Sequence, residues 1–151
     1  MATQYITCAF VDDYAVGDEL LDWPLHITLV PWFFVDNMRQ FQDDLVQHVA
    51  DIHRIPVTVG EQRTWGPNVV NVIQRSAPLH ELHARLLHLI TSSGELLINQ
   101  QYTGLNYTPH ITHQKSLSAQ PGDNVTIGTV YIIKKDTARR AKTVIARVDL
   151  V

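Results

Sequence analysis

The sequence predicts an α+β fold: two lobes of mainly antiparallel sheet, two amphipathic helices, and a central cleft that carries two His-x-Thr motifs. Three observations lead to this prediction. Strand-like segments come in pairs rather than in strict alternation with helices, which favours antiparallel pairing. Two segments have the apolar spacing of amphipathic helices. A short histidine–threonine motif opens a strand-like segment in each half of the chain, which suggests two related halves.

The expected strands are rich in β-branched and aromatic residues and lie between turn-forming residues. Pro31 interrupts the second strand, and a proline inside a strand indicates an edge or a bulge. Gly66 and Pro67 provide the turn between the third and fourth strands. Strands are predicted at residues 5–11, 26–34, 55–59, 69–74, 96–98, 125–134 and 143–151, with a further one starting at His110.

Two helices are expected, at residues 36–53 and 76–94. Asp36 and Ser76 are suitable N-caps, and Gly94 ends the second helix. Apolar side chains recur at steps of three and four residues in both segments, so each helix should bury one stripe. The stripes consist of Met38, Phe41, Leu45, Val49 and Ile52, and of Leu79, Leu82, Leu86, Leu89 and Ile90.

The composition is that of one globular domain. The 151 residues are 45% hydrophobic and 18% charged, and the apolar runs are too short to cross a bilayer. Residues 1–5 lack the basic start of a secretory signal. The one cysteine, Cys8, cannot form an internal disulfide and is expected in the core. We therefore expect a cytoplasmic monomer.

The charge excludes a general nucleic-acid binder, because the chain carries a formal net charge of −3. Recognition of a single phosphate or of a chain end stays open. The chain has neither a Gly-rich phosphate loop nor a Gly-x-Ser-x-Gly elbow, which excludes P-loop nucleotide triphosphatases and α/β-hydrolases.

The repeated motif reads His26-Ile27-Thr28-Leu29 in the first half and His110-Ile111-Thr112-His113 in the second, each close behind a proline. Side chains alternate faces along a strand, so the histidine and the threonine of each copy should share one face. Histidine titrates near neutral pH, so one imidazole can give a proton while the other takes one. The threonine hydroxyls can donate hydrogen bonds to phosphate oxygens.

On these residues the chain resembles the two-histidine (2H) phosphoesterase superfamily, which includes 2′–5′ RNA ligase-like proteins and cyclic phosphodiesterases. The resemblance implies a single domain over residues 1–151, built of two pseudo-symmetric lobes. It implies that His26 is the general acid and His110 the general base, with Thr28 and Thr112 on the phosphate. Members often carry an arginine five positions after the second histidine; this chain has Lys115 there, which keeps the charge but not the bidentate fork. At His113 the family pattern usually has an apolar residue, and we expect this side chain to reach solvent at a sheet edge.

The expected substrates are RNA ends or small nucleotide phosphodiesters, with no cofactor and no metal. A 2′,3′-cyclic phosphate and a 2′–5′ linkage both fit, and the residues leave open the direction of the reaction and the order of acid and base. Phe33 and Tyr107 are candidates for stacking on the substrate, with Phe34 and Trp65 also near the motifs or in expected loops.

Other interpretations stay open at this stage. The chain could be a non-catalytic protein that binds nucleotides or RNA ends. His80 and His83 have a spacing that can hold zinc on a helix, although a solvated helix face is the favoured interpretation. A basic cluster near the C-terminus could steer a phosphate-bearing substrate or be a plain solvated turn; it consists of Lys134, Lys135, Arg139, Arg140 and Lys142.

Overall fold

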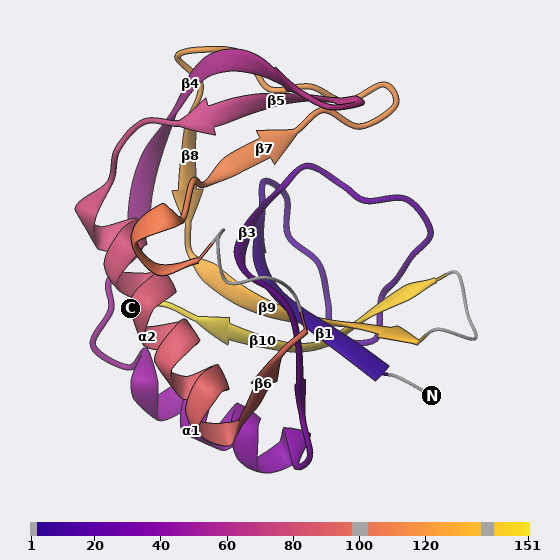
Figure 1. Cartoon of the computed structure of the whole chain (residues 1–151), viewed down its shortest axis with the longest axis vertical. Coiled ribbons are helices and arrows are strands. Elements are labelled where there is room, and N and C mark those ends of the chain that lie inside the picture. Colours follow the sequence, from indigo (N-terminus) through magenta and orange to yellow (C-terminus); the bar gives the residue numbers. More distant parts are fainter. Residues whose placement is uncertain (1–2, 98–102, 137–140) are drawn as a thin grey trace.

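The computed structural model describes residues 3–97, 103–136 and 141–151. These residues form two α-helices and a ten-stranded sheet in which every observed strand pairing is antiparallel, so the α+β class is confirmed. The strand order is β2-β10-β9-β1-β3-β7-β5-β4-β8, with β6 paired to β3. Both helices lie on one side of the sheet (Figure 1).

The elements follow one another as β1 (Thr3–Phe10), β2 (Glu19–Leu20), β3 (His26–Val35), α1 (Met38–His48), β4 (Ile55–Trp65), β5 (Asn68–Ile73), α2 (Ala77–Ser93), β6 (Gly94–Leu96), β7 (His110–Thr112), β8 (Asn124–Ile127), β9 (Thr129–Asp136) and β10 (Lys142–Asp149). A 3₁₀ turn over Gly104–Asn106 precedes β7. The segment expected as one strand over residues 125–134 forms two strands, β8 and β9, because the strand conformation is interrupted at Gly128. The two-residue β2 was not predicted.

Helix α2 has the predicted bounds, with the Ser76 hydroxyl accepting a hydrogen bond from the backbone N–H of Leu79 and Gly94 at the C-cap. Helix α1 is shorter than predicted. Its N-cap is Asn37 rather than Asp36, since the Asn37 side chain accepts from the Gln40 N–H. A side chain can cap a helix only when its backbone sits at the Ncap position, and two neighbouring capping residues cannot be distinguished by type alone.

The sheet buries apolar side chains on both faces. One face packs on the helices and forms the main core with their predicted stripes, including Phe41, Leu45 and Leu86. The other face of β1, β9 and β10 carries a second apolar cluster, made of Ile6, Cys8, Phe10, Leu20, Tyr131, Ile133 and Val144. Cys8 is fully buried within it, as expected for a core residue.

Strand β3 lies in the middle of the sheet, between β1 on one side and β7 with β6 on the other. Pro31 is therefore not on an edge, and the predicted alternative, a bulge, is what the structure contains. Tyr5 pairs with Phe33 and Thr7 pairs with Val30, so β3 uses three residues where β1 uses two. The buried Thr7 hydroxyl fills the break, accepting from the Val30 N–H at 2.9 Å.

No helix among the described residues is long and apolar enough to cross a membrane. Arg139 and Arg140 of the predicted basic cluster lie outside the described residues, as does the end of the strand expected at 96–98.

Candidate active site

The two motifs lie on neighbouring strands, because β3 and β7 pair antiparallel with Ile27 opposite Ile111. Both isoleucine side chains are buried in the main core. Alternation then places the histidines and threonines on the opposite face, where all four are partly exposed.

The same register sets Thr28 opposite His110 and His26 opposite Thr112. The two histidines are thus diagonal neighbours, a relation that separates residues of adjacent strands by about 7–8 Å. We expected the motif strands to face each other across a cleft, but they lie side by side in one sheet, so backbone pairing positions the four side chains.

Each histidine is fixed by the same hydrogen bond. Nδ1 of His26 donates to the Pro24 carbonyl at 2.8 Å, and Nδ1 of His110 donates to the Thr108 carbonyl at 2.9 Å. A carbonyl oxygen can only accept, so Nδ1 carries the proton in both rings and Nε2 is the atom left for proton transfer. Within the described part of the chain, Nε2 of neither ring has a hydrogen-bond partner.

His26 sits among aromatic rings. Trp23 lies at 4.4 Å between ring centroids with an interplanar angle of 30°, and Phe10 contacts the imidazole edge-on at 6.2 Å. Burial lowers the pKa of His26, and the positive charges of His110 and Lys142 lower it further, against the opposing effect of the Pro24 hydrogen bond. The neutral form of His26 is therefore favoured in the resting protein.

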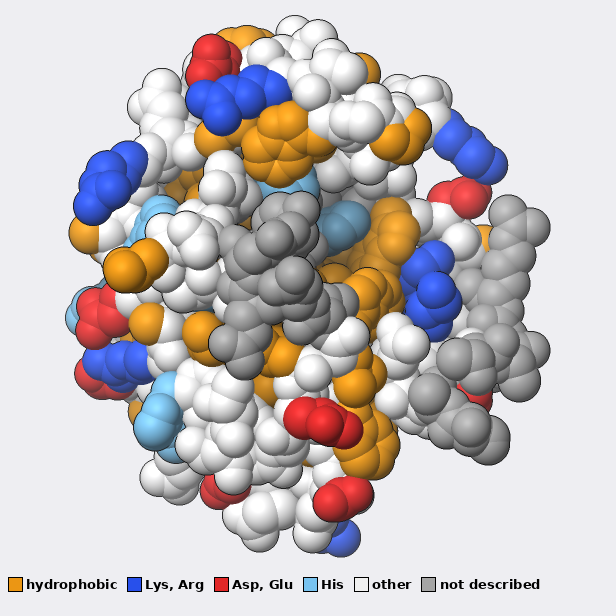
Figure 2. All heavy atoms as spheres, viewed as in Figure 1, with side chains coloured by type: hydrophobic (Ala, Val, Ile, Leu, Met, Phe, Trp, Pro, Cys, Tyr) orange, Lys and Arg blue, Asp and Glu red, His pale blue; other side chains and the backbone are white. Residues whose placement is uncertain are grey.

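His110 borders a cavity of about 540 Å³. Trp65, at the end of β4, packs edge-to-face on the imidazole at 4.8 Å. The cavity lining is formed by Thr28, Pro31, Trp65, Asn106, Tyr107, Thr108 and His110. In Figure 2, histidine side chains lie in a hollow at the centre of the face, next to a band of hydrophobic side chains.

Tyr107 lines this cavity but is mostly buried, with an exposed fraction of 7%. Its hydroxyl donates to the Thr28 carbonyl at 2.7 Å, and its ring stacks on His83 at 3.9 Å, nearly parallel. The side chain thus joins the segment before β7 to β3 and aligns the two motifs.

The prediction of a solvated helix face is wrong for His83, whereas His80 is partly exposed. His83 is 1% exposed; its Nδ1 donates to the Leu29 carbonyl and its Nε2 accepts from the Gly104 N–H at 2.9 Å. His80 lies within hydrogen-bond distance of the Ser76 and Tyr107 carbonyls. Both nitrogens of His83 are occupied by the backbone, so this ring is a structural link. No group of three or more His, Cys, Asp or Glu side chains among the described residues is placed to hold a metal ion.

Phe33 does not reach the substrate side. It is fully buried in the main core, where it packs on Tyr5 and Phe41. Phe33 stands seven positions after His26, so alternation along β3 places it on the opposite, inner face, and Trp32 on the face of His26. The two one-residue register shifts between Thr28 and Phe33 cancel in their effect on the alternation and leave these faces unchanged. The expectation that Phe33 stacks on a substrate is therefore incorrect.

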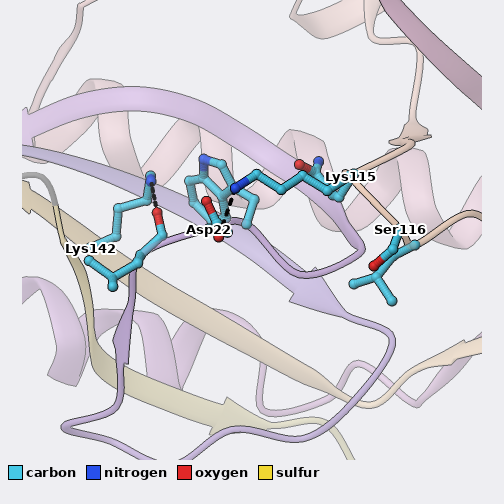
Figure 3. A pocket seen from close by; sticks show the side chains of 8 residues that line it. Asp22, Lys115, Ser116 and Lys142 are labelled. Carbon is cyan, nitrogen blue, oxygen red and sulfur yellow. Dashed lines mark hydrogen bonds and ion pairs between the residues drawn. The ribbon is translucent and has the colours of Figure 1, made fainter.

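Lys115 is exposed and forms an ion pair with Asp22 at 3.4 Å. Figure 3 shows the pair in a second cavity, of about 410 Å³, with Lys142 on its other side. Trp23 also lines this cavity and is the ring that contacts His26. The second cavity therefore adjoins the His26 side of the motif pair, whereas the first adjoins His110.

His113, directly after β7, does not lie at a sheet edge, because β7 is flanked by β3 and β5, and its side chain is only partly exposed. Its Nε2 donates to the Asn71 Oδ1 at 2.5 Å, and the buried Asn71 amide donates in turn to the Gly60 carbonyl at 3.1 Å. A polar pair thus replaces the apolar contact that the family pattern usually has.

Trp23 and Trp32 lie beside the motif but were not among the predicted site residues. Their indole rings lie 6.4 Å apart, and Lys142 and Lys135 lie over Trp23 and Trp32 at 5.1 and 5.6 Å. Trp23 stands three positions before His26, beside the proline that leads into the motif, which is the signal that points to it. Trp32 stands six positions after His26, and strand alternation, which places both on the same face, is the signal that points to it.

Comparison with known proteins identifies the family and shows the same fold in solved structures. The family model described as "2′-5′ RNA ligase superfamily" matches residues 8–150. Among solved structures, Escherichia coli LigT complexed with 3′-AMP is similar with a TM-score of 0.66 and 15% identity over 99% of this chain and 98% of that one. A structure described as a phosphoesterase gives 0.63 and 16% over 99% and 98%, and TT0787 of Thermus thermophilus gives 0.60 and 12% over 97% of both chains. No curated protein matches the sequence. The family match extends over nearly the whole chain and includes both motif strands, and the chain belongs to the 2′-5′ RNA ligase superfamily of 2H phosphoesterases.

Proposed function

We propose that this protein is a metal-independent phosphodiesterase that acts on 2′,3′-cyclic phosphate or 2′–5′ linked RNA and nucleotide substrates. The supporting observation is the matched pair of histidines. Both project from one face of two paired strands, and both have Nδ1 tied to a backbone carbonyl two residues earlier, so both present Nε2.

Hydrolysis of a cyclic phosphate needs two proton transfers. Water adds to phosphorus and loses a proton, while the departing ribose oxygen gains one. We assign His110 as the base that takes the proton from water and His26 as the acid that protonates the ribose oxygen, following the family resemblance. The lowered pKa of His26 makes its protonated form a stronger acid, although a less populated one.

The remaining motif residues are proposed to bind the phosphate. The hydroxyls of Thr28 and Thr112 share the face of the histidines and make no hydrogen bond with a described residue, so they can donate to the non-bridging oxygens. Lys115 is proposed to contact a phosphate oxygen after exchanging its exposed ion pair with Asp22. That exchange requires little free energy, since exposed ion pairs contribute roughly 0–1 kcal/mol.

The cavity at His110 is proposed to hold a nucleoside. Its volume of about 540 Å³ and its aromatic lining suit a base and a ribose. The similar E. coli LigT has been crystallised with 3′-AMP, ATP and NADP⁺, which are ligands of that protein and fit the same kind of site. No cofactor enters the proposed reaction.

The test is a screen of defined phosphodiesters with and without EDTA, with the phosphate position identified in each product. We expect turnover of a 2′,3′-cyclic phosphate to be unaffected by EDTA. The His110→Gln variant, purified in parallel, controls for contaminating nuclease. Loss of activity in EDTA that added metal restores would contradict the proposal in favour of a metal-dependent hydrolase. Binding of nucleotides without turnover of any of the phosphodiesters would favour a non-catalytic nucleotide-binding protein.

A further inference from the structure

A surface of alternating indole rings and ammonium groups lies beside His26. It consists of Trp23, Trp32, Lys135 and Lys142, and we call it the indole–lysine surface. Lys135 on β9 is directly opposite Lys142 on β10. Both lysines lie on the same face of their strands as Ile133 and Val144, two positions along, which belong to the second apolar cluster.

This face is also the face of the motif. Phe10 of the second cluster pairs with His26 across β1 and β3, and Trp23 and Trp32 pack against the same cluster. The contacts form a continuous series from the catalytic candidate outward: His26 to Trp23 at 4.4 Å, Trp23 to Trp32 at 6.4 Å, and Trp32 to the Lys135 ammonium at 5.6 Å.

The arrangement gathers positive charge over two indole rings. Like charges directly opposite each other on neighbouring strands repel, and here two lysines are paired in that way. Both indole rings remain partly exposed rather than completing the core. The chain as a whole carries a net charge of −3, so the positive charge of this surface is a local feature and not a property of the whole protein.

Single-stranded nucleic acid needs these two elements together. Its bases stack on aromatic rings and its phosphates are attracted to positive charge. We propose that the indole–lysine surface binds the nucleotides that continue an RNA strand beyond the reacting nucleotide, so that the enzyme prefers oligonucleotide ends to free cyclic mononucleotides. This inference rests on the proposed function for the location of the reacting phosphate, between His26 and His110.

The geometry leaves room for both parts of such a substrate. The cavity lined by Trp65 and Tyr107 adjoins His110, while the cavity lined by Trp23, Lys115 and Lys142 adjoins His26 (Figure 3). A mononucleotide occupies one of these cavities, and a strand has further bases and phosphates for the indole–lysine surface.

The chain offers a matched control for the test. Lys134 precedes Lys135 on β9 and therefore points to the other face, where it lines a separate cavity with Glu19 and Asp136. Lys134→Ala and Lys135→Ala remove the same charge from adjacent positions. Trp32→Ala removes the outer indole, and Trp32→Phe keeps an aromatic ring.

Binding is measured first, by fluorescence anisotropy competition with 3′-AMP and with tetraadenylate that ends in a 3′-phosphate. The wild-type protein should bind the tetranucleotide at least about 10-fold more tightly. Trp32→Ala and Lys135→Ala should weaken tetranucleotide binding by about 5- to 150-fold and leave 3′-AMP binding within about twofold. Lys134→Ala should behave as the wild type, and Trp32→Phe should recover most of the loss.

Turnover is measured next, with 2′,3′-cyclic AMP and with tetraadenylate that ends in a 2′,3′-cyclic phosphate. The same variants should lower kcat/KM for the tetranucleotide, through KM, and spare the mononucleotide. Length-dependent binding that depends on Trp32 and Lys135 without turnover of either substrate would overturn the proposed function and support the strand-binding surface. Equal affinity for mononucleotide and tetranucleotide, or equal losses in Lys134→Ala and Lys135→Ala, would overturn this inference whatever the turnover.

Discussion

Histidine has different functions in this chain according to what its two nitrogens contact. His26 and His110 each donate Nδ1–H to a backbone carbonyl, and their Nε2 atoms have no hydrogen-bond partner among the described residues. His83 uses both nitrogens, on the Leu29 carbonyl and the Gly104 N–H, and is buried. The motif identifies the first two in the sequence. The role of His83 could not be read from its helical spacing, because its partners lie on β3 and in the loop before β7.

His83 should make stability depend on pH. Burial lowers the pKa of His83, and the charge of His80 lowers it further, while the hydrogen bond to Leu29 opposes both. The unfolded chain thus takes up a proton more readily than the folded one, so the contribution of His83 is complete above about pH 6.5 and is lost as the pH falls below it. His83→Ala should cost about 2–4 kcal/mol of unfolding free energy at pH 7.5, from the lost volume and the two unpaired backbone groups.

Urea unfolding at pH 7.5 and pH 5 measures this effect. The difference in unfolding free energy between wild type and His83→Ala should shrink at pH 5. At that pH the unfolded wild-type chain gains a proton on His83 more readily than the folded protein does, so the wild type loses stability that the variant never had. Replacement of the exposed His53 by alanine is the control and should change stability by less than about 0.5 kcal/mol. A difference that is the same at both pH values would show that His83 does not titrate in this range.

At the scale of elements, β3 is the strand that connects most of the other elements. It pairs with β1, β6 and β7, packs on α2, and holds both His26 and the bulge at Pro31. Pro31 could be recognised in the sequence as an irregularity. The register of β3 with β1 shifts by one residue twice between Thr28 and Phe33, so the two shifts cancel in their effect on the alternation. Alternation counted from His26 therefore predicts the face of Trp32 and the face of Phe33 correctly, and only the stretch around Val30 departs from it.

The junction of α2 and β6 requires a glycine. At Gly94 the helix ends and the strand begins, opposite Val35 of β3. A Cβ atom there would overlap the Phe34 carbonyl oxygen and the Val35 side chain. Since the obstacle is backbone within the sheet, Gly94→Ala should destabilise the protein by about 1–3 kcal/mol.

Denaturant unfolding tests this prediction with Gly128→Ala as the matched control. A Cβ at Gly128, between β8 and β9, would meet the flexible Arg54 side chain at an ordinary 3.6 Å. The control should lose much less stability than Gly94→Ala. Equal midpoints for the two variants would mean that β6 can shift away from β3 without cost.

At the scale of the whole molecule, the sheet order brings the two halves of the chain together. Local pattern predicted both helices, most strands and the two motif strands, since apolar spacing and β-propensity act over a few residues. The pairing of Ile27 with Ile111 joins segments far apart in sequence, and no local pattern encodes it. The family resemblance predicts that the motifs act together, and the structure shows that they are neighbours in one sheet.

The central claim is that His26 and His110 act as one acid–base unit, and a double-mutant cycle tests it most directly. We measure kcat/KM on a substrate with a 2′,3′-cyclic phosphate for wild type, His26→Ala, His110→Ala and the double variant, with circular dichroism to verify the fold. Each single change should lower activity by about 100- to 10,000-fold, and the double variant should lose far less than the product of the two.

The wild-type pH profile belongs to the same measurement. The active pair holds one proton, so the rate should be bell-shaped. The midpoint of the acidic limb should lie below the ordinary histidine pKa of about 6.5, because the pKa of His26 is lowered. A folded His26→Ala protein with undiminished activity, or losses that multiply fully in the double variant, would contradict the two-histidine mechanism.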